Sequence, residues 1–491
     1  MRLKTEYFLK NYLLNFKTKK DRYSAYPLPE TGKYYKLKMT VGNKSIIFNI
    51  VKTEKLDAPV NHVLTSLYKE QIHTLLCCYG TRETGSDDIL FISANDFKIA
   101  ACHIDDKGNV EVNIGVNLID EVFYHLSAIE EYNKEANGKN ARPYYSGDAG
   151  KSTNEPLVDD FYNLFTDIIN TCLEKFGVTE GMQRKLNGFN ISLTHDVDAI
   201  RKNYFTSVRY LSFLAATFAM KFDLEVFGRI FRYLTHKSDF NQIINIMLLE
   251  KDFDYKSTFF FYSKAAKNSF SSKMIDKFID PSYDMSSSAY SGIRNIFSEA
   301  GFEAGLHSSY SAARDYELLM EELKLLKGLS RTAIISNRNH FLNFSSVHTP
   351  LLLEKSGIKC DATFYYNNVC GFLRHKTCSP FYFYSHAENR IVDVIEIPTV
   401  IMDSTLFNYL CCTDETAYKK SVEILNMVKD RRGVACINWH NETSAPEYGW
   451  YSTYKDILKW IKDNSATAYT IGEVYNRLVP KGFDGATVNT G

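Results

Sequence analysis

A short apolar run that ends in two carboxylates opens the longer part of the chain: Ile191-Ser-Leu-Thr-His-Asp-Val-Asp198. Its apolar residues are typical of a buried β-strand. Because successive side chains of a strand point to opposite faces, Thr194, Asp196 and Asp198 share one face, and His195 points to the other. Two carboxylates on one face repel each other unless a cation or a shared proton offsets the repulsion. The spacing leaves two interpretations open: a metal or acid/base site, or an ordinary Asp-x-Asp that caps a loop.

Further β-rich runs follow and alternate with helical stretches. The expected strands are 189–198, 257–262, 304–308, 332–337, 360–365, 391–397, 434–439 and 466–471. The expected helices between them include 316–326, 349–355, 417–429 and 454–463. Repeated alternation of strand and helix predicts a parallel β/α architecture, most economically a barrel. In such barrels the chemistry lies at the carboxyl ends of the strands, where the loops converge.

The first part of the chain follows another pattern. Alternating runs at 37–50, 88–104 and 110–116 predict strands, and the apolar spacing at 118–132 and 157–176 predicts helices. We therefore expect a smaller α/β or α+β domain of unknown role over residues 1–185, followed by the barrel domain over residues 186–482.

The composition excludes several classes of protein. With 45% hydrophobic and 24% charged residues among 491, the chain is globular and long enough for more than one domain. Lys plus Arg equals Asp plus Glu at 58 each, so no net charge attracts nucleic acid. The ten cysteines include no C-x-x-C pair, which argues against a zinc knuckle or a redox pair.

The sequence gives no sign of a membrane span or a secretion signal. The longest apolar run, 210–220, is shorter than the roughly 20 residues that cross a bilayer. We expect an amphipathic helix there and no transmembrane segment. The first residues, Met1-Arg-Leu-Lys-Thr-Glu-Tyr, lack the apolar core of a signal peptide, so we expect a cytoplasmic protein.

Histidine and arginine stand at three other strand ends. His307 ends the third expected strand, Arg338 and His340 follow the fourth, and His440 follows the last but one. A single histidine at such a place is usually structural. The carboxyl ends of parallel strands meet at one barrel mouth, however, so these side chains are expected to converge on the two carboxylates.

The ordered motifs THDVD, KSTFFFY, GLHSSYS, RNHFL, KCDATFYY, EIPTVIMD and NWHNE resemble those of the polysaccharide deacetylases, the NodB-homology carbohydrate esterases. In particular, the chain is similar to a bacterial subgroup with an extra N-terminal α/β domain. The resemblance spans residues 187–478 and, more weakly, 120–177, and it rests on the order and spacing of the motifs, since no single motif is specific. It implies a distorted parallel (β/α) barrel of the NodB-homology type that removes an acetyl group from a sugar with a divalent metal.

The resemblance also implies the catalytic residues. Asp196 matches the general base of the family, and Arg338 resembles the arginine that orients this base. His440 matches the general acid, and Asp361 lies in the region of a later Asp-containing motif. These residue types suit hydrolysis, because a carboxylate takes a proton from water and a histidine gives one to the leaving group.

The implied metal site departs from the family pattern at one position. Asp198 and His307 match two metal ligands, but the second family histidine, four residues after the first, is Ser311 here. His340 could supply the missing nitrogen; otherwise water completes the shell, or the site is lost. Ser311 and Trp439 are kept as candidate substrate-binding residues, although Trp439 suits the core equally well.

Together these features predict a metal-dependent hydrolase that removes acetyl groups from an N- or O-acetylated polysaccharide or glycan precursor. Zinc is the first choice among the divalent ions. The alternative is a catalytically silent carbohydrate-binding or scaffold protein that keeps the barrel.

Overall fold

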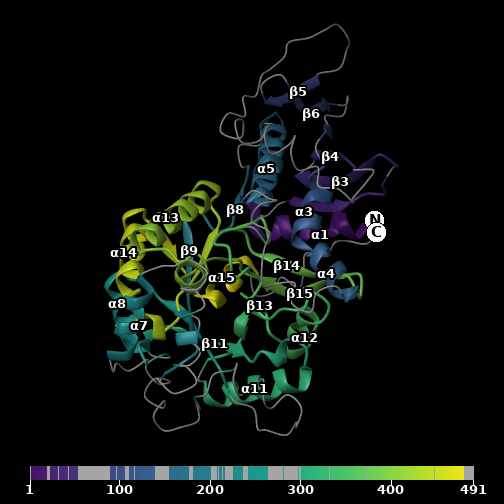
Figure 1. Cartoon of the computed structure of the whole chain (residues 1–491). Helices are drawn as coiled ribbons and strands as arrows, with labels where there is room; N and C mark the ends of the chain where they lie inside the picture. The colour runs from purple at the N-terminus through teal and green to yellow at the C-terminus, as the bar shows by residue number, and fades with distance from the viewer. Residues whose placement is uncertain are drawn as a thin grey trace. The chain divides into compact units, whose positions relative to one another are not determined.

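The computed structural model of the chain is shown in Figure 1. It describes residues 2–18, 23–30, 32–41, 44–52, 89–94, 97–104, 110–115, 117–138, 154–175, 181–200, 207, 210–212, 214–215, 225–235, 241–263, 280, 283, 297, 300–330, 332–372, 374–446 and 448–479. The amphipathic helix expected at 210–220 lies largely outside the described residues.

The chain divides into two compact units. The first consists of Met1–Ser127, Leu157–Asn187 and Leu478–Gly491, and the second of Ala128–Pro156 and Gly188–Arg477. None of the helices among the described residues combines the length and the apolar character that crossing a membrane requires.

A six-stranded mixed sheet organises the first unit. Its strands, in spatial order, are β2 (Tyr23–Pro27), β3 (Tyr34–Val41), β4 (Lys44–Val51), β7 (Val110–Ile114), β6 (Phe97–Ile104) and β5 (Ile89–Ala94). The pair β3–β4 is the hairpin predicted at 37–50, with Val41 opposite Lys44 at its turn. The unit also holds the helices α1 (Arg2–Asn15), α3 (Leu118–Leu126) and α5 (Leu157–Lys175) and the short strand pair β1 (Phe16–Thr18) and β8 (Met182–Arg184).

The helix predicted at 118–132 is interrupted. α3 ends at Leu126, and α4 (Ile129–Ala136) begins after Ala128, whose φ of 52° is left-handed. A non-glycine residue rarely adopts this conformation, and it cannot continue a right-handed helix. The apolar spacing runs through this point, so the sequence pattern alone does not show the break.

A curled half-barrel sheet forms the core of the second unit. Its strands, in spatial order, are β14 (Phe381–Ser385), β15 (Arg390–Glu396), β13 (Cys360–Asp361), β12 (Ser336–Asn339), β11 (Glu303–Ser308), β10 (Ser257–Phe261), β9 (Asn190–Val197), β17 (Val434–Asn438) and β16 (Thr399–Met402), and β18 (Thr467–Ala468) pairs with β9. All pairs in this sheet are parallel except β14–β15. The predicted parallel β/α architecture is therefore present, with an antiparallel strand at one end.

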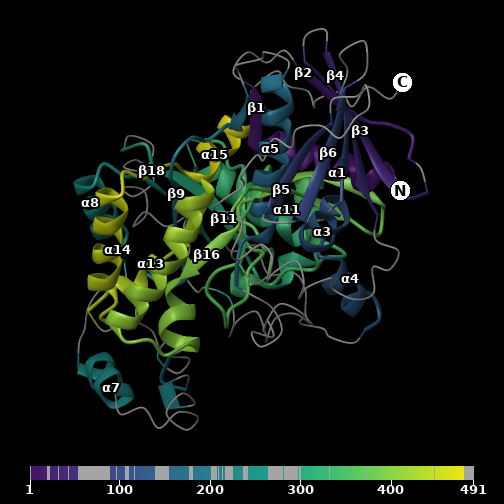
Figure 2. The same cartoon turned by 90° about the horizontal axis from the view of Figure 1, so that it is seen from above.

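The sheet is buried by helices that follow its strands. They include α8 (Ile243–Asp252), α11 (Tyr316–Leu329), α12 (Thr349–Ser356), α13 (Asp414–Arg431), α14 (Tyr451–Asp463) and α15 (Ile471–Leu478). Figure 2 shows α13 and α14 side by side. Every residue of β9 is buried, as expected for a parallel strand covered on both faces.

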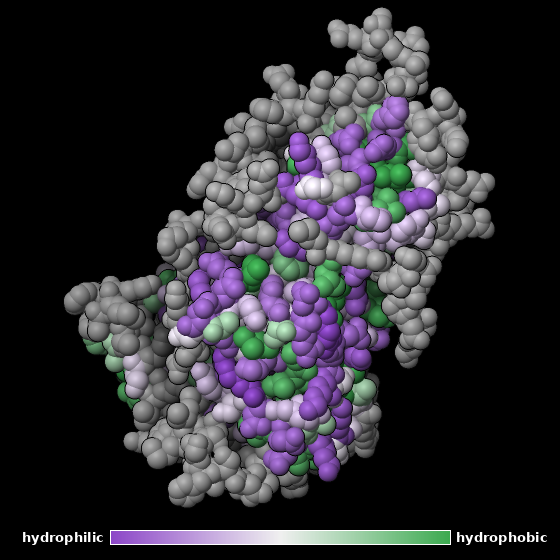
Figure 3. Space-filling view, turned by 90° about the vertical axis from the view of Figure 1, so that its right-hand side faces the viewer, coloured by the Kyte–Doolittle hydropathy of each residue, from purple (hydrophilic) through white to green (hydrophobic). Residues whose placement is uncertain are grey.

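The face of the molecule shown in Figure 3 mixes hydrophilic and hydrophobic residues over its described surface. Such mixing is usual, because protein surfaces keep a large apolar fraction. Buried polar side chains gather instead at the carboxyl ends of the strands of the second unit.

Candidate active site

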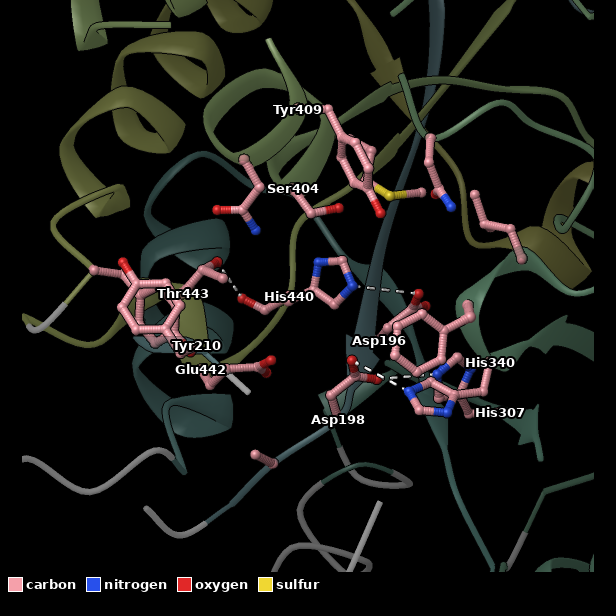
Figure 4. Close-up of a pocket in the computed structure, with 17 residues that line it drawn as sticks. Asp196, Asp198, Tyr210, His307, His340, Ser404, Tyr409, His440, Glu442 and Thr443 are labelled. Atoms are coloured by element: carbon pink, nitrogen blue, oxygen red, sulfur yellow. Dashed lines mark hydrogen bonds and ion pairs between the residues drawn. The ribbon is translucent and has the colours of Figure 1, made fainter. Parts of the chain in front are cut away.

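Asp196 and Asp198 lie at the carboxyl end of β9 as the strand alternation predicts. Both line one cavity, whereas His195 points to the other side of the strand and does not line it. Figure 4 shows the two carboxylates facing histidines that come from other strand ends. The other lining residues are Ala199, Tyr210, His307, His340, Phe341, Leu342, Asn367, Met402, Ser404, Asn408, Tyr409, His440, Glu442, Thr443 and Tyr448.

Two histidines face Asp198. The Nε2 atom of His307 lies 3.1 Å from Asp198 Oδ1, and the Nε2 atom of His340 lies 3.5 Å from Oδ2. One potential ligand atom from each of the three residues lies within 4.8 Å of the other two. A carboxylate and two imidazoles at this spacing are a ligand set of the kind that zinc takes at catalytic sites.

The other ring nitrogens fix how these histidines point. His307 Nδ1 donates to the backbone oxygen of Arg338 over 2.8 Å, and His340 Nδ1 lies 3.1 Å from Asp280 Oδ1. Hydrogen bonds of this kind hold a metal-binding histidine in place and direct its Nε2 lone pair inward. The buried Nε2 atom of His340 has no hydrogen-bond partner among the residues that the structure describes, so Asp198, His307 and His340 fit a cation between them.

The charge around His340 supports the same interpretation. Burial by itself lowers the pKa of this histidine, but the carboxylates of Asp198 and Asp280 outweigh it and raise the pKa to about 9. A site that attracts a proton this strongly is also attractive to a metal ion, and the ion must displace the proton to bind.

Asp196 is held as a carboxylate beside this cluster. Arg338 Nη1 donates to its Oδ1 over 3.0 Å, and Asn438 Nδ2 donates to its Oδ2 over 2.9 Å. Burial alone raises the pKa of Asp196, but the guanidinium of Arg338 and the nearby histidines outweigh it and keep the pKa below its usual 3.8. The guanidinium of Arg338 is itself buried and lies over the ring of Phe260, so its position is fixed.

His440 lies across the cavity from Asp198, with its Nε2 atom 3.8 Å from Asp196 Oδ2. Its Nδ1 atom is 2.6 Å from Asp403 Oδ1. Burial disfavours the charged ring, but Asp403, Asp198 and Asp196 outweigh it and raise the pKa of His440 well above 6.5. The neighbouring carboxylates therefore favour the protonated form of this ring, which faces the cavity.

Four predicted site residues are not among the described residues that line the cavity: Arg338, which reaches it only through Asp196, and Asp361, Trp439 and Ser311. Asp361 is fully buried in β13 and accepts a hydrogen bond from Asn337 over 2.8 Å. Trp439 is fully buried and stacks on Tyr454 with ring centroids 5.0 Å apart. Ser311 begins a short 3₁₀ helix, Ser311–Ala313.

The sequence did not identify the two carboxylates that contact the histidines of the site, Asp403 and Asp280, or the cavity-lining Glu442. Asp403 follows β16 directly and ends the motif EIPTVIMD, so its place after an apolar run was a usable signal. Asp280, the partner of His340, stands in a stretch without a periodic pattern. Only the fold brings it to the histidine.

No protein-family model and no curated protein matches the chain. A search of solved structures finds a putative polysaccharide deacetylase from Mycobacterium smegmatis at 12% identity, covering 60% of this chain and 91% of that one, with a TM-score of 0.38. A probable polysaccharide deacetylase from Pseudomonas aeruginosa PAO1 matches at 8% identity, with coverages of 60% and 91% and a TM-score of 0.39. A CE4 family pseudoenzyme from Bacillus anthracis matches at 11% identity, with coverages of 60% and 67% and a TM-score of 0.30.

The matches include polysaccharide deacetylases, the family that the sequence motifs resemble. They also include a CE4 family pseudoenzyme.

Proposed function

We propose that this chain is a metal-dependent hydrolase that removes an acetyl group from an N- or O-acetylated polysaccharide or glycan precursor. One observation carries the proposal: Asp198, His307 and His340 bring their potential ligand atoms together at a cavity that Asp196 and His440 also line. The acetylated sugar as substrate comes from the sequence resemblance, whereas the hydrolytic chemistry comes from the site.

Asp198, His307 and His340 would hold the ion. A divalent metal bound there would lower the pKa of a water molecule and polarise the acetyl carbonyl. Zinc suits the two imidazoles and the carboxylate better than magnesium or calcium, which prefer oxygen ligands.

The proton transfers fall to two other residues. Asp196 is ionised and lies beside the cluster, so it accepts the proton of the attacking water. Arg338 keeps it charged and oriented. His440 reaches the cavity from the other side, and the carboxylates around it raise its pKa well above 6.5, which suits it to donate a proton to the departing amine or alcohol.

The proposal is tested by measuring acetate release from N-acetylglucosamine oligomers and from O-acetylated xylan, with zinc-loaded protein and with the same protein after chelation. Release that is lost on chelation and restored by zinc supports the hydrolase. The alternative, a silent carbohydrate-binding protein, predicts retention of these glycans on the protein without release of acetate.

We expect Asp403→Asn to shift the pH dependence of hydrolysis. His440 acts in its protonated form, so the rate falls as the pH rises through its pKa. Removing the Asp403 charge lowers that pKa, and the fall in kcat therefore moves to lower pH. At pH 8 we expect kcat to decrease about 10- to 100-fold, the range typical of losing a carboxylate that orients a functional histidine.

The check is a pH–rate profile of both proteins at saturating substrate. Thr443→Val is the matched control, because it removes another hydrogen bond to Asp403 while leaving its charge in place. An alkaline limb that stays where it is in Asp403→Asn would count against His440 as the acid.

A further inference from the structure

A fully buried polar cluster lies behind the candidate site, on the other face of β9. Its centre is His195, whose Nε2 atom lies 2.8 Å from Glu250 Oε1. Glu250 also accepts hydrogen bonds from Tyr454 Oη over 2.5 Å and from Ser257 Oγ over 2.6 Å. All four side chains have an exposed fraction of 0%. The cluster therefore does not meet substrate.

The second nitrogen of His195 reaches the backbone next to the candidate acid. Its Nδ1 atom lies 2.6 Å from the carbonyl oxygen of Trp439, so Nδ1 carries the hydrogen and donates it. Strand β17 ends at Asn438, and the Trp439 N–H still pairs with Thr194 of β9 over 2.9 Å. A further backbone hydrogen bond to β9 runs from Asn441 N to Asp196 O over 3.3 Å, and the carbonyl of Trp439 between these two bonds is bound by the side chain of His195.

The peptide unit between Trp439 and His440 is thus held from both sides. Its carbonyl oxygen accepts from His195, and its N–H donates to Asp403 Oδ2 over 2.9 Å. Because a peptide unit is planar, two hydrogen bonds on opposite edges fix its orientation. The direction in which His440 leaves the backbone is fixed with it.

A buried polar pair of this kind is not explained by stability alone. Taking a carboxylate and an imidazole out of water is costly, and well-packed apolar residues of similar volume are often as stable or more stable. A positioning role accounts for the cluster, because a functional group must be held within about 0.5 Å of its working geometry.

We propose that the His195–Glu250 pair positions His440 for proton donation, through the carbonyl oxygen of Trp439. Glu250 holds the ring of His195, and His195 holds the peptide unit that carries His440. The proposal rests on the hydrolase function, in which His440 is the acid. His195 is a positioning residue and touches no reacting atom.

Two matched variants separate the two contacts of His195. The amide nitrogen of Asn occupies the place of Nδ1, and that of Gln occupies the place of Nε2. His195→Asn can therefore still donate to Trp439, whereas His195→Gln keeps only the contact with Glu250. We expect kcat to fall about 10- to 100-fold in His195→Gln, most for poor leaving groups, and by less than about 10-fold in His195→Asn. KM and bound zinc should stay unchanged in both.

A purely structural role predicts another result. Both variants would then lose the same amount of unfolding free energy, measured by denaturant titration. The folded fraction of each variant would hydrolyse all substrates, whatever their leaving group, with the kcat of the wild type. That outcome would overturn the proposal, as would a change in KM alone. If His195→Gln does not fold, Glu250→Gln is compared with Glu250→Leu. The side-chain amide in Glu250→Gln can still form a hydrogen bond with the ring of His195, whereas the apolar side chain in Glu250→Leu cannot.

A measurement without substrate keeps this proposal separate from the hydrolase function. The Nδ1 proton that His440 shares with Asp403 is observed by proton NMR and assigned by its absence in His440→Ala. We expect this resonance to shift or disappear in His195→Gln and to persist in His195→Asn. An unchanged resonance in His195→Gln contradicts the positioning role even if the wild type releases no acetate.

Discussion

Asp196→Asn is expected to keep the bound metal and to lose turnover. The asparagine has the same shape but cannot accept a proton from water, so kcat should fall about 10²- to 10⁴-fold, the range of a general base. The metal should remain, because Asp198 and the two histidines are separate from Asp196 and supply the ligand atoms. Metal content and kcat are measured on the same preparation.

The matched control is Asp198→Asn, the same chemical change two residues further along the strand. It should lose both metal and turnover, because Asp198 lies between the two histidines. Asp196→Asn also leaves the buried guanidinium of Arg338 without its carboxylate, which costs about 3–5 kcal/mol of unfolding free energy. The folded fraction of each variant is therefore checked by circular dichroism. Equal loss of metal in the two variants would refute the division between base and ligand.

His340→Ala is expected to weaken zinc binding by far more than the 10- to 100-fold change typical of an outer-shell residue, since a ligand nitrogen is removed. The Nε2 atom of His340 lies 3.5 Å from Asp198 Oδ2, and no residue in the described part of the chain forms a hydrogen bond with it. Calorimetric titration with zinc, in competition with a chelator of known affinity, measures the change.

Ser311→Ala is the control for this prediction. Ser311 stands where the family motif has a second histidine, but it is not among the described residues that line the cavity. Its removal should leave zinc affinity nearly intact. Unchanged affinity in His340→Ala would show that this residue is not a ligand, and a loss in Ser311→Ala would place the serine in the shell.

The residues that meet at the strand ends could be predicted from two regularities: side chains alternate between the faces of a strand, and the carboxyl ends of parallel strands lie at one edge of the sheet. The alternation in THDVD assigned Asp196 and Asp198 to one face and His195 to the other, and the structure has this arrangement. The parallel sheet then brings the ends of β9, β11 and β12 together, since His307 is paired with Arg338 and Asp196 with Phe260 of the next strand.

Other parts of the site could not be predicted from local patterns. Asp280 and Glu250 reach their histidines only through tertiary packing, and no spacing in the sequence links them. The strands β14 and β16 were missed because runs of four or five residues show too little alternation to be separated from a loop. Strand β12 begins at Ser336, whereas the apolar pattern had suggested 332, because the pattern cannot show where the ladder to β11 and β13 begins.

The proposed metal-dependent hydrolysis is tested by measuring zinc content and acetate release together on the purified wild-type protein and on His340→Ala. We expect one zinc ion per wild-type chain, release of acetate from acetylated glycan, and loss of both in the variant. A folded wild-type protein that binds no divalent ion, or one that releases acetate equally well after complete chelation, would contradict the proposal.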